Sequence, residues 1–268
     1  MIIGHTKQQE VLQNSLRENF LAHAYLFSGP YGIGKLELAL DIAQNLLNLS
    51  LFEASDGYFY QDGLNIEEAR QLKKKLVLSP LYSEHKVVII NNAQNIKKES
   101  ANAMLKLLEE PAKDTIFFLI TTNSFLILPT IRSRCYEMKF NYVNDKLIEK
   151  HLNTNSIVNL KAHWSGRPSV AKKLLEDKEY LSKLIDYKKD AEKFIEGSLV
   201  ERFQIVDKYS KTNSTNDFLK IVIEHLRTIN FKNKYAILRQ LLQLYKGLFA
   251  TNLNSQFGLR ALAVKSRN

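Results

Sequence analysis

The chain has 268 residues, of which 45% are hydrophobic and 25% are charged, which is ordinary for a globular protein and leaves room for two or three domains. Lysine and arginine outnumber aspartate and glutamate by 38 to 28, so the formal net charge is +10. This excess is compatible with work on or near nucleic acid and equally with solvated lysine-rich helix faces, so charge alone assigns no function.

Cysteine usage and the length of the apolar runs limit the environment. The single cysteine, Cys135, excludes an intramolecular disulfide framework and a four-thiolate zinc site, and it fits a reducing cytosol. No charged leader followed by an apolar stretch opens the chain, which predicts no signal peptide. Runs such as 87–90 and 116–120 are far too short to cross a bilayer. We expect a cytoplasmic protein with no metal and no membrane contact.

A strand, a glycine-rich loop and a helix follow one another near the N-terminus. After a helix expected at about residues 7–19, residues 24–27 form an apolar run typical of a buried strand. The next loop holds Gly29, Gly34 and Lys35 at the spacing G-x-x-x-x-G-K, with Gly32 between them. This is the phosphate-binding P-loop, in which glycines turn backbone N–H groups toward phosphate oxygens. The helix N-terminus and the lysine add positive charge.

The groups that would complete this site are missing. The residue after the lysine is normally Ser or Thr, whose hydroxyl holds Mg²⁺, but here it is Leu36. An ATPase also needs carboxylates at the end of a neighbouring strand, where this chain has Asn91 and Asn92. Three losses in one site predict that ATP is not hydrolysed. Two interpretations of the loop stay open: it is kept because the fold needs the turn, or it binds phosphate or ADP without Mg²⁺.

The remaining pattern predicts an α/β domain followed by helices. Strands and helices alternate in the first half of the chain, which predicts a parallel sheet covered on both faces, with elements at residues 58–60, 66–78, 86–91, 95–110 and 115–122. After residue 144 there is no convincing strand, and helices are expected at residues 145–152, 157–164, 169–176 and from 179 to the end. We expect three domains, at residues 1–141, 142–178 and 179–268.

Several stretches carry a resemblance to a known family. Residues 23–30, HAYLFSGP, resemble the P-loop approach of the bacterial clamp-loader AAA+ subunits, and residues 101–111, ANAMLKLLEEP, are similar to their A-N-A-L-L-K-x-L-E-E-P helix. Residues 121–123, TTN, and then 128–135, LPTIRSRC, resemble their sensor strand and Ser-Arg-Cys motif. Order and spacing match over about residues 1–140. The resemblance implies a P-loop AAA+ core, a helical lid and an all-α collar domain that holds subunits in a ring.

The resemblance also implies a role for one arginine. Arg134 lies where the family places an arginine finger, which reaches into the ATP site of a neighbouring subunit, and Ser133 and Cys135 would position it. A finger stabilises the charge that develops on the transferred phosphoryl group. The alternative is a surface arginine in a salt bridge.

The chain departs from the family pattern in two places: the first predicts no structural zinc, and the second agrees with an inactive nucleotide site. The segment 51–63 is short and lacks the four-cysteine zinc module that members usually carry. In the stretch 166–171, GRPSVA, Ser169 stands where active members carry a sensor arginine, and Arg167 is out of register.

The expected function is therefore a non-hydrolysing subunit of the DNA polymerase III clamp loader, with no cofactor of its own. The resemblance implies gamma/tau-type and delta-type subunits as partners and, through the complex, the sliding clamp and primer-template DNA. One alternative is an active ATPase of the gamma type, which would need a hydroxyl at position 36 and carboxylates at 91 or 92. Another is a stand-alone DNA-binding protein, which predicts salt-sensitive DNA binding by the purified monomer.

Overall fold

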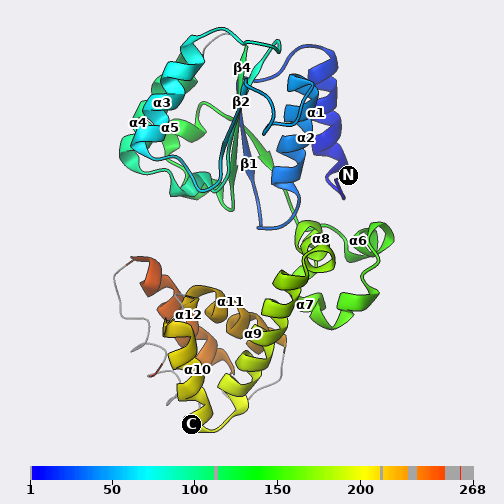
Figure 1. Ribbon diagram of the computed structural model, residues 1–268, viewed down its shortest axis with the longest axis vertical. Coiled ribbons are helices and arrows are strands. Elements are labelled where there is room, and N and C mark those ends of the chain that lie inside the picture. The colour runs from blue at the N-terminus through cyan, green and yellow to red at the C-terminus, as the bar shows by residue number, and fades with distance from the viewer. Residues whose placement is uncertain (1, 112–113, 212–213, 229–233, 251–259, 261–268) are drawn as a thin grey trace. The chain divides into compact units, whose positions relative to one another are not determined.

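The computed structural model describes residues 2–111, 114–211, 214–228, 234–250 and 260. These residues divide into two compact units (Figure 1). The first has the residues up to 153 together with 165–171, and the second has 154–164 together with the described residues from 172 onward. The division into three domains stays a prediction. Among the described residues, no helix has the length and apolar composition needed to cross a membrane.

The first unit is built on a five-stranded sheet in the order β2-β3-β4-β1-β5, and every neighbouring pair of strands is parallel. Its strands are β1 (Ala24–Ser28), β2 (Gly57–Tyr60), β3 (Lys86–Ile90), β4 (Thr115–Thr121) and β5 (Tyr136–Lys139). Its α-helices are α1 (Thr6–Arg17), α2 (Lys35–Leu47), α3 (Ile66–Val77), α4 (Lys98–Glu109), α5 (Pro129–Arg132) and α6 (Asp145–His151). Two short 3-10 helices, η1 (Ala93–Asn95) and η2 (Ser124–Leu126), follow β3 and β4.

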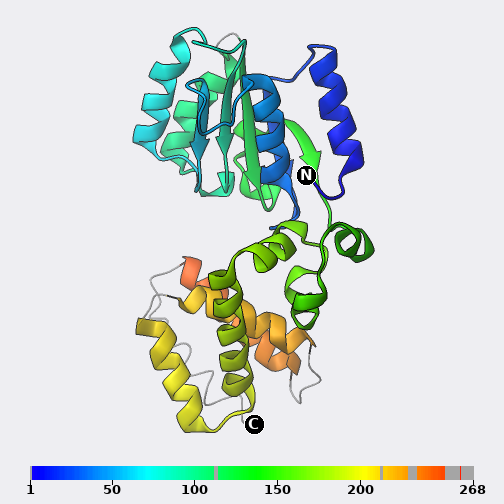
Figure 2. The same cartoon turned by 45° about the vertical axis from the view of Figure 1, so that its right-hand side comes forward.

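Helices cover both faces of this sheet, as the apolar strands require. Successive residues of a strand point to opposite faces, so Val87 and Ile89 join one buried cluster while Val88 and Ile90 join the other. Helices α1 and α2 lie on the first face, and α3, α4 and α5 lie on the second (Figures 1 and 2). The predicted parallel α/β sheet is therefore confirmed.

Sequence patterns predicted neither the edge strand β5 nor the short helix α5 before it. Strand β5 pairs only with β1 and buries one of its four residues, Met138. Its residues Glu137 and Lys139 interrupt the apolar run that marks a buried strand. The four-residue helix α5 precedes it, and Ile131 is its buried anchor. Together α5 and β5 bracket the Ser-Arg-Cys motif.

A buried carboxylate fixes the loop before β3. The carboxylate of Asp56 accepts hydrogen bonds from the backbone N–H groups of Leu81, Tyr82 and Ser83, at distances from 2.9 to 3.2 Å, and from the Ser83 hydroxyl at 3.0 Å. Burial alone would raise the pKa of Asp56, but these hydrogen bonds together hold the pKa below its usual value. The loop is therefore anchored by one side chain, a long-range contact that sequence patterns do not show.

The second unit contains helices only, among the residues described. Its elements are η3 (Asn155–Leu160), α7 (Lys161–Trp164), α9 (Lys178–Glu196), α10 (Leu199–Lys211), α11 (Thr215–Thr228) and α12 (Lys234–Ala250), and α8 (Pro168–Glu176) has residues in both units. Helix α11 packs against α7, α9, α10 and α12. Stacked rings of Tyr209 and Phe218, with centroids 4.1 Å apart, lie in its core. The indole of Trp164 is buried and donates to the carbonyl of Ile157 at 3.0 Å.

Candidate functional site

The loop between β1 and α2 has the backbone shape that its glycines predict. Gly29, Gly32 and Gly34 all have positive φ angles, of 146°, 76° and 104°, which side chains other than hydrogen rarely allow. Gly34 is the N-cap of α2, so the helix begins at Lys35. The sequence-predicted residues Gly29, Gly32, Gly34 and Lys35 thus come together in one tight strand-to-helix turn.

Lys35 points into this loop rather than out of it. Its Nζ donates to the carbonyls of Gly29 and Pro30, both at 2.5 Å, and the residue is only 5% exposed. Burial lowers its pKa to about 8, against which the charge of Glu37 acts. The positive charge that would meet a phosphate is occupied by the backbone of its own loop.

The tip of the loop is held from two other segments of the same unit. The carbonyl of Gly32 accepts from the N–H of Ser169 at 3.0 Å, and a Cβ added at Gly32 would lie 2.5 Å from a methyl group of Val170. On the other side, Nε2 of His5 lies 2.7 Å from the carbonyl oxygen of Ile33. These contacts join the loop to the start of α8 and to the N-terminus, and no sequence motif indicated them.

The Mg²⁺ position is used for packing. Leu36 is partly buried against the apolar cluster of α1, α2 and the sheet. At the end of β3, the amides form a chain instead of a charged site: Nε2 of Gln94 contacts Oδ1 of Asn92 at 3.4 Å, and the Thr121 hydroxyl donates to Oε1 of Gln94 at 2.9 Å. Neutral amides and a hydroxyl neither act as a general base nor supply charge to a divalent cation.

One carboxylate does lie near Asn92, and the sequence analysis missed it. Oδ1 of Asp62 accepts from the side-chain amides of Asn92 at 3.2 Å and Asn95 at 2.6 Å. Asp62 follows β2, however, and β3 and β4 lie between β2 and the P-loop strand β1. Its amide partners come from the end of β3 and from η1. Among the residues described, no group of three or more His, Cys, Asp or Glu side chains could hold a metal ion.

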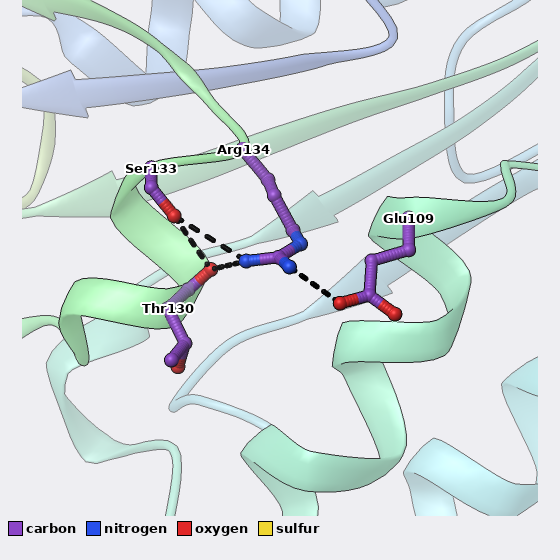
Figure 3. Close-up of polar contacts among 4 residues, drawn as sticks. All are labelled: Glu109, Thr130, Ser133 and Arg134. Atoms are coloured by element: carbon purple, nitrogen blue, oxygen red, sulfur yellow. Dashed lines mark hydrogen bonds and ion pairs between the residues drawn. The ribbon is translucent and has the colours of Figure 1, made fainter.

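Arg134 lies in the short link between α5 and β5, as Figure 3 shows. Its Nη1 donates to the carbonyl of Thr130 at 2.7 Å and to the hydroxyl of Ser133 at 3.3 Å. Its Nη2 forms an ion pair with Oε1 of Glu109, at the end of α4, at 2.5 Å. The Arg134 side chain is 33% exposed, so it contacts solvent while three groups hold its guanidinium.

Cys135 supports this link by packing rather than by reactivity. Its Sγ contacts the carbonyl of Ile131 at 3.3 Å, and the side chain lies against the apolar cluster under α3 and α4. Burial raises the pKa of the thiol to about 12, so the thiolate is absent at neutral pH and the residue is no nucleophile.

Burial of His5 predicts that the stability of the folded chain depends on pH. Burial lowers the pKa of His5 below 6.5 and the charge of Lys35 lowers it further, while the Ile33 hydrogen bond raises it in part. The unfolded chain therefore binds this proton first as the pH falls, so the free energy of unfolding should decrease from pH 6.5 downward through the folded pKa. We expect His5→Gln to show a smaller decrease between pH 7.5 and pH 5.5, measured by urea denaturation. An equal decrease in both proteins would contradict the assignment.

The sheet order, the P-loop after the inner strand β1 and the arginine before the edge strand β5 define the α/β core of a P-loop protein of the AAA+ class. A solved structure agrees with this fold: a DNA polymerase III gamma-subunit-related protein from Thermotoga maritima superposes with a TM-score of 0.71, at 20% identity, covering 97% of each chain. The predicted fold class is confirmed.

The sequence comparisons identify the family. The profile of the family described as "DNA polymerase III, delta subunit" matches residues 4–57 and 54–144, just over half of the chain. The chain therefore belongs to this family. It is 36% identical over 162 residues to DNA polymerase III subunit delta' of Bacillus subtilis, which confirms the predicted resemblance to bacterial clamp-loader subunits. It is also 30% identical over 171 residues to subunit tau of the same species.

The two relatives are longer than the matched region. The alignments cover 53% and 57% of this chain, and the chain spans 49% of the delta' relative and 30% of the tau relative. The comparisons thus fix the family without assigning a role to any residue. The roles of Arg134, Ser133, Cys135 and the P-loop residues remain predictions.

Proposed function

We propose that this chain is a non-hydrolysing, delta-prime-type subunit of a DNA polymerase III clamp loader, and that it supplies Arg134 to the ATP site of a neighbouring subunit. Gamma/tau-type and delta-type subunits would be its partners, in the cytoplasm. It would meet the sliding clamp and primer-template DNA only as part of the complex. The helical residues from 179 onward would hold it in the ring.

The contrast between the two basic side chains carries this proposal. Lys35, which would serve the chain's own nucleotide site, is 5% exposed and bonded to carbonyls of its own loop. Arg134 is 33% exposed and lies outside the loop. Arg134 is therefore better placed than Lys35 to bring a positive charge into contact with a phosphate on another molecule. The packing of Leu36 and the amides at the end of β3 support the same conclusion.

An arginine offered in trans needs no nucleotide of its own. Its planar guanidinium presents donors in a fixed fork, and its charge stabilises the phosphoryl group as negative charge develops on it. The Thr130 carbonyl and the Ser133 hydroxyl accept hydrogen bonds from Nη1 of Arg134. They would fix the direction of the side chain before the neighbour binds, which reduces the ordering needed in the transition state.

The tau relative favours a second candidate, an active ATPase of the gamma type. That function needs a hydroxyl at position 36 and a carboxylate at the end of β3. The chain has Leu36 in place of the hydroxyl residue, and Asn91 and Asn92 in place of the carboxylate after β3. Turnover by the isolated chain would revive this candidate.

The test compares the chain alone with the chain in the loader. Calorimetry should detect no Mg²⁺-dependent binding of ATP or ADP to the purified chain, and a turnover assay should show no hydrolysis. Added to gamma/tau-type and delta-type subunits from the same source, the chain should raise their DNA-dependent ATPase rate. Mg²⁺-dependent binding with turnover by the chain alone would show that the proposal is wrong.

A further inference from the structure

The Glu109 carboxylate forms an ion pair with the guanidinium of Arg134, the group that the proposed function needs. Glu109 is the last residue of α4 and Arg134 follows α5, so the two meet only through the fold, 25 residues apart in sequence. Their 2.5 Å contact involves Nη2, while Nη1 is held separately by Thr130 and Ser133 (Figure 3). The two amino groups of one guanidinium thus have different partners, one a carboxylate and the other neutral oxygens.

A carboxylate and a phosphate cannot both use this face of Arg134 favourably. The pair cancels most of the arginine's charge, which is what a phosphate would be attracted to. A phosphate that approached Nη2 would also lie next to the Glu109 carboxylate, and the two negative charges would repel each other. The ion pair must therefore open, or the finger would deliver little charge.

We propose that Glu109 is a positioning residue that holds Arg134 in the unassembled chain and releases it when the nucleotide phosphate of a neighbouring subunit replaces the carboxylate. This inference rests on the proposed function of Arg134. The phosphate takes over Nη2, while Thr130 and Ser133 keep Nη1, so the guanidinium exchanges one partner and keeps its direction. Assembly is then coupled to the presence of a phosphate on the neighbour.

The surroundings suit a pair that opens. The side chains of Arg134 and Glu109 are 33% and 46% exposed, and exposed ion pairs are weak because water screens them. Release needs only rotation of the Glu109 side chain, with no change in the backbone of α4. Glu109 also lies at a helix C-terminus, where its negative charge is unfavourable beside the carbonyl dipoles. Glu109→Gln removes the weakly stabilising ion pair and also the unfavourable charge at the helix end. The two changes offset each other, so the variant should fold with nearly unchanged stability.

The first arm of the test measures how available the Arg134 guanidinium is in the isolated full-length chain. We expect Glu109→Gln to raise the rate of phenylglyoxal modification at Arg134 by about two- to fivefold, the factor that an exposed ion pair supplies. Peptide mass spectrometry reads this rate, with Arg70 as the internal reference. Glu110→Gln, the same charge change one residue later, should leave the rate unchanged. An unchanged or slower rate in Glu109→Gln overturns the proposal.

The second arm uses the assembled loader. Glu109→Gln should lower the concentration of this chain that gives half-maximal ATPase by about two- to fivefold and leave the maximal rate unchanged, whereas Glu110→Gln should change neither. A lower maximal rate for Glu109→Gln would mean that the carboxylate supports the finger in its active position, which overturns release. Arg134→Ala separates the two ideas: if it leaves the ATPase rate unchanged, the finger itself is wrong, whatever the first arm shows about the pair.

Discussion

Arg134→Ala is expected to remove at least about nine-tenths of the ATPase activity that the wild-type chain adds to a reconstituted loader, because an arginine finger accelerates phosphoryl transfer by about 10³–10⁵-fold at the site it serves. Loader assembly should stay intact. The lost ion pair with Glu109 is exposed, and such pairs contribute about 0–1 kcal/mol to stability. The measurement is the DNA-dependent ATPase rate with and without each variant, beside gel filtration of the complex.

Two further variants give this result its meaning. Arg134→Lys keeps the charge but loses the planar fork, so it should restore only part of the activity. Arg70→Ala removes a surface arginine that pairs with Glu67 at 3.6 Å on α3, and it should change nothing. Equal ATPase rates for Arg134→Ala and wild type would mean that Arg134, like Arg70, only forms a surface salt bridge.

Sequence patterns predicted the elements that rest on local physics. Strands β3 and β4 are buried along their whole length, and such strands appear as unbroken apolar runs because both faces of the sheet are covered. The glycine spacing of the P-loop is also local, since it reflects φ angles that only the glycines adopt easily. The predicted helix at 95–110 is longer than the observed one, because η1 occupies residues 93–95 and α4 begins at Lys98.

Strand β5 could not be predicted from hydrophobic patterns. A strand at the edge of a sheet has one neighbour and an exposed side, so its sequence need not be apolar. Tyr136 is exposed and Met138 is buried, while Glu137 accepts a hydrogen bond from Ser28 at 2.9 Å. Four residues with one apolar anchor give too short a pattern to separate a strand from a loop.

For the candidate site, the sequence motifs proposed residues but indicated none of their contacts. The motifs located Lys35 and Arg134, but their partners depend on how distant segments meet. His5 and Ile33 are 28 residues apart, and Glu109 lies 25 residues before Arg134. Gln94 and Thr121 are 27 residues apart. Without an expected placement for each side chain, no spacing rule indicates such pairs.

Gly29→Ala is expected to destabilise the fold by about 4 kcal/mol or more. Gly29 has a φ of 146°, and a Cβ added there would lie 2.2 Å from the carbonyl oxygen of Phe140. That oxygen cannot move away easily, because the N–H of Phe140 donates to the carbonyl of Ser28 at 2.8 Å and continues the pairing of β1 with β5. The measurement is the urea midpoint by circular dichroism.

Gly34→Ala is the matched control, and it decides why the loop is kept. Gly34 also has a positive φ, of 104°, but an added Cβ would meet nothing closer than 3.9 Å, so backbone strain alone should cost about 1–2 kcal/mol. A much larger loss of stability for Gly29→Ala than for Gly34→Ala would mean that glycine is needed at position 29 because Phe140 approaches so closely. The loop would then be kept for folding. Equal small losses in both variants would mean that folding does not require this glycine, and a bound phosphate would become the better explanation of the loop.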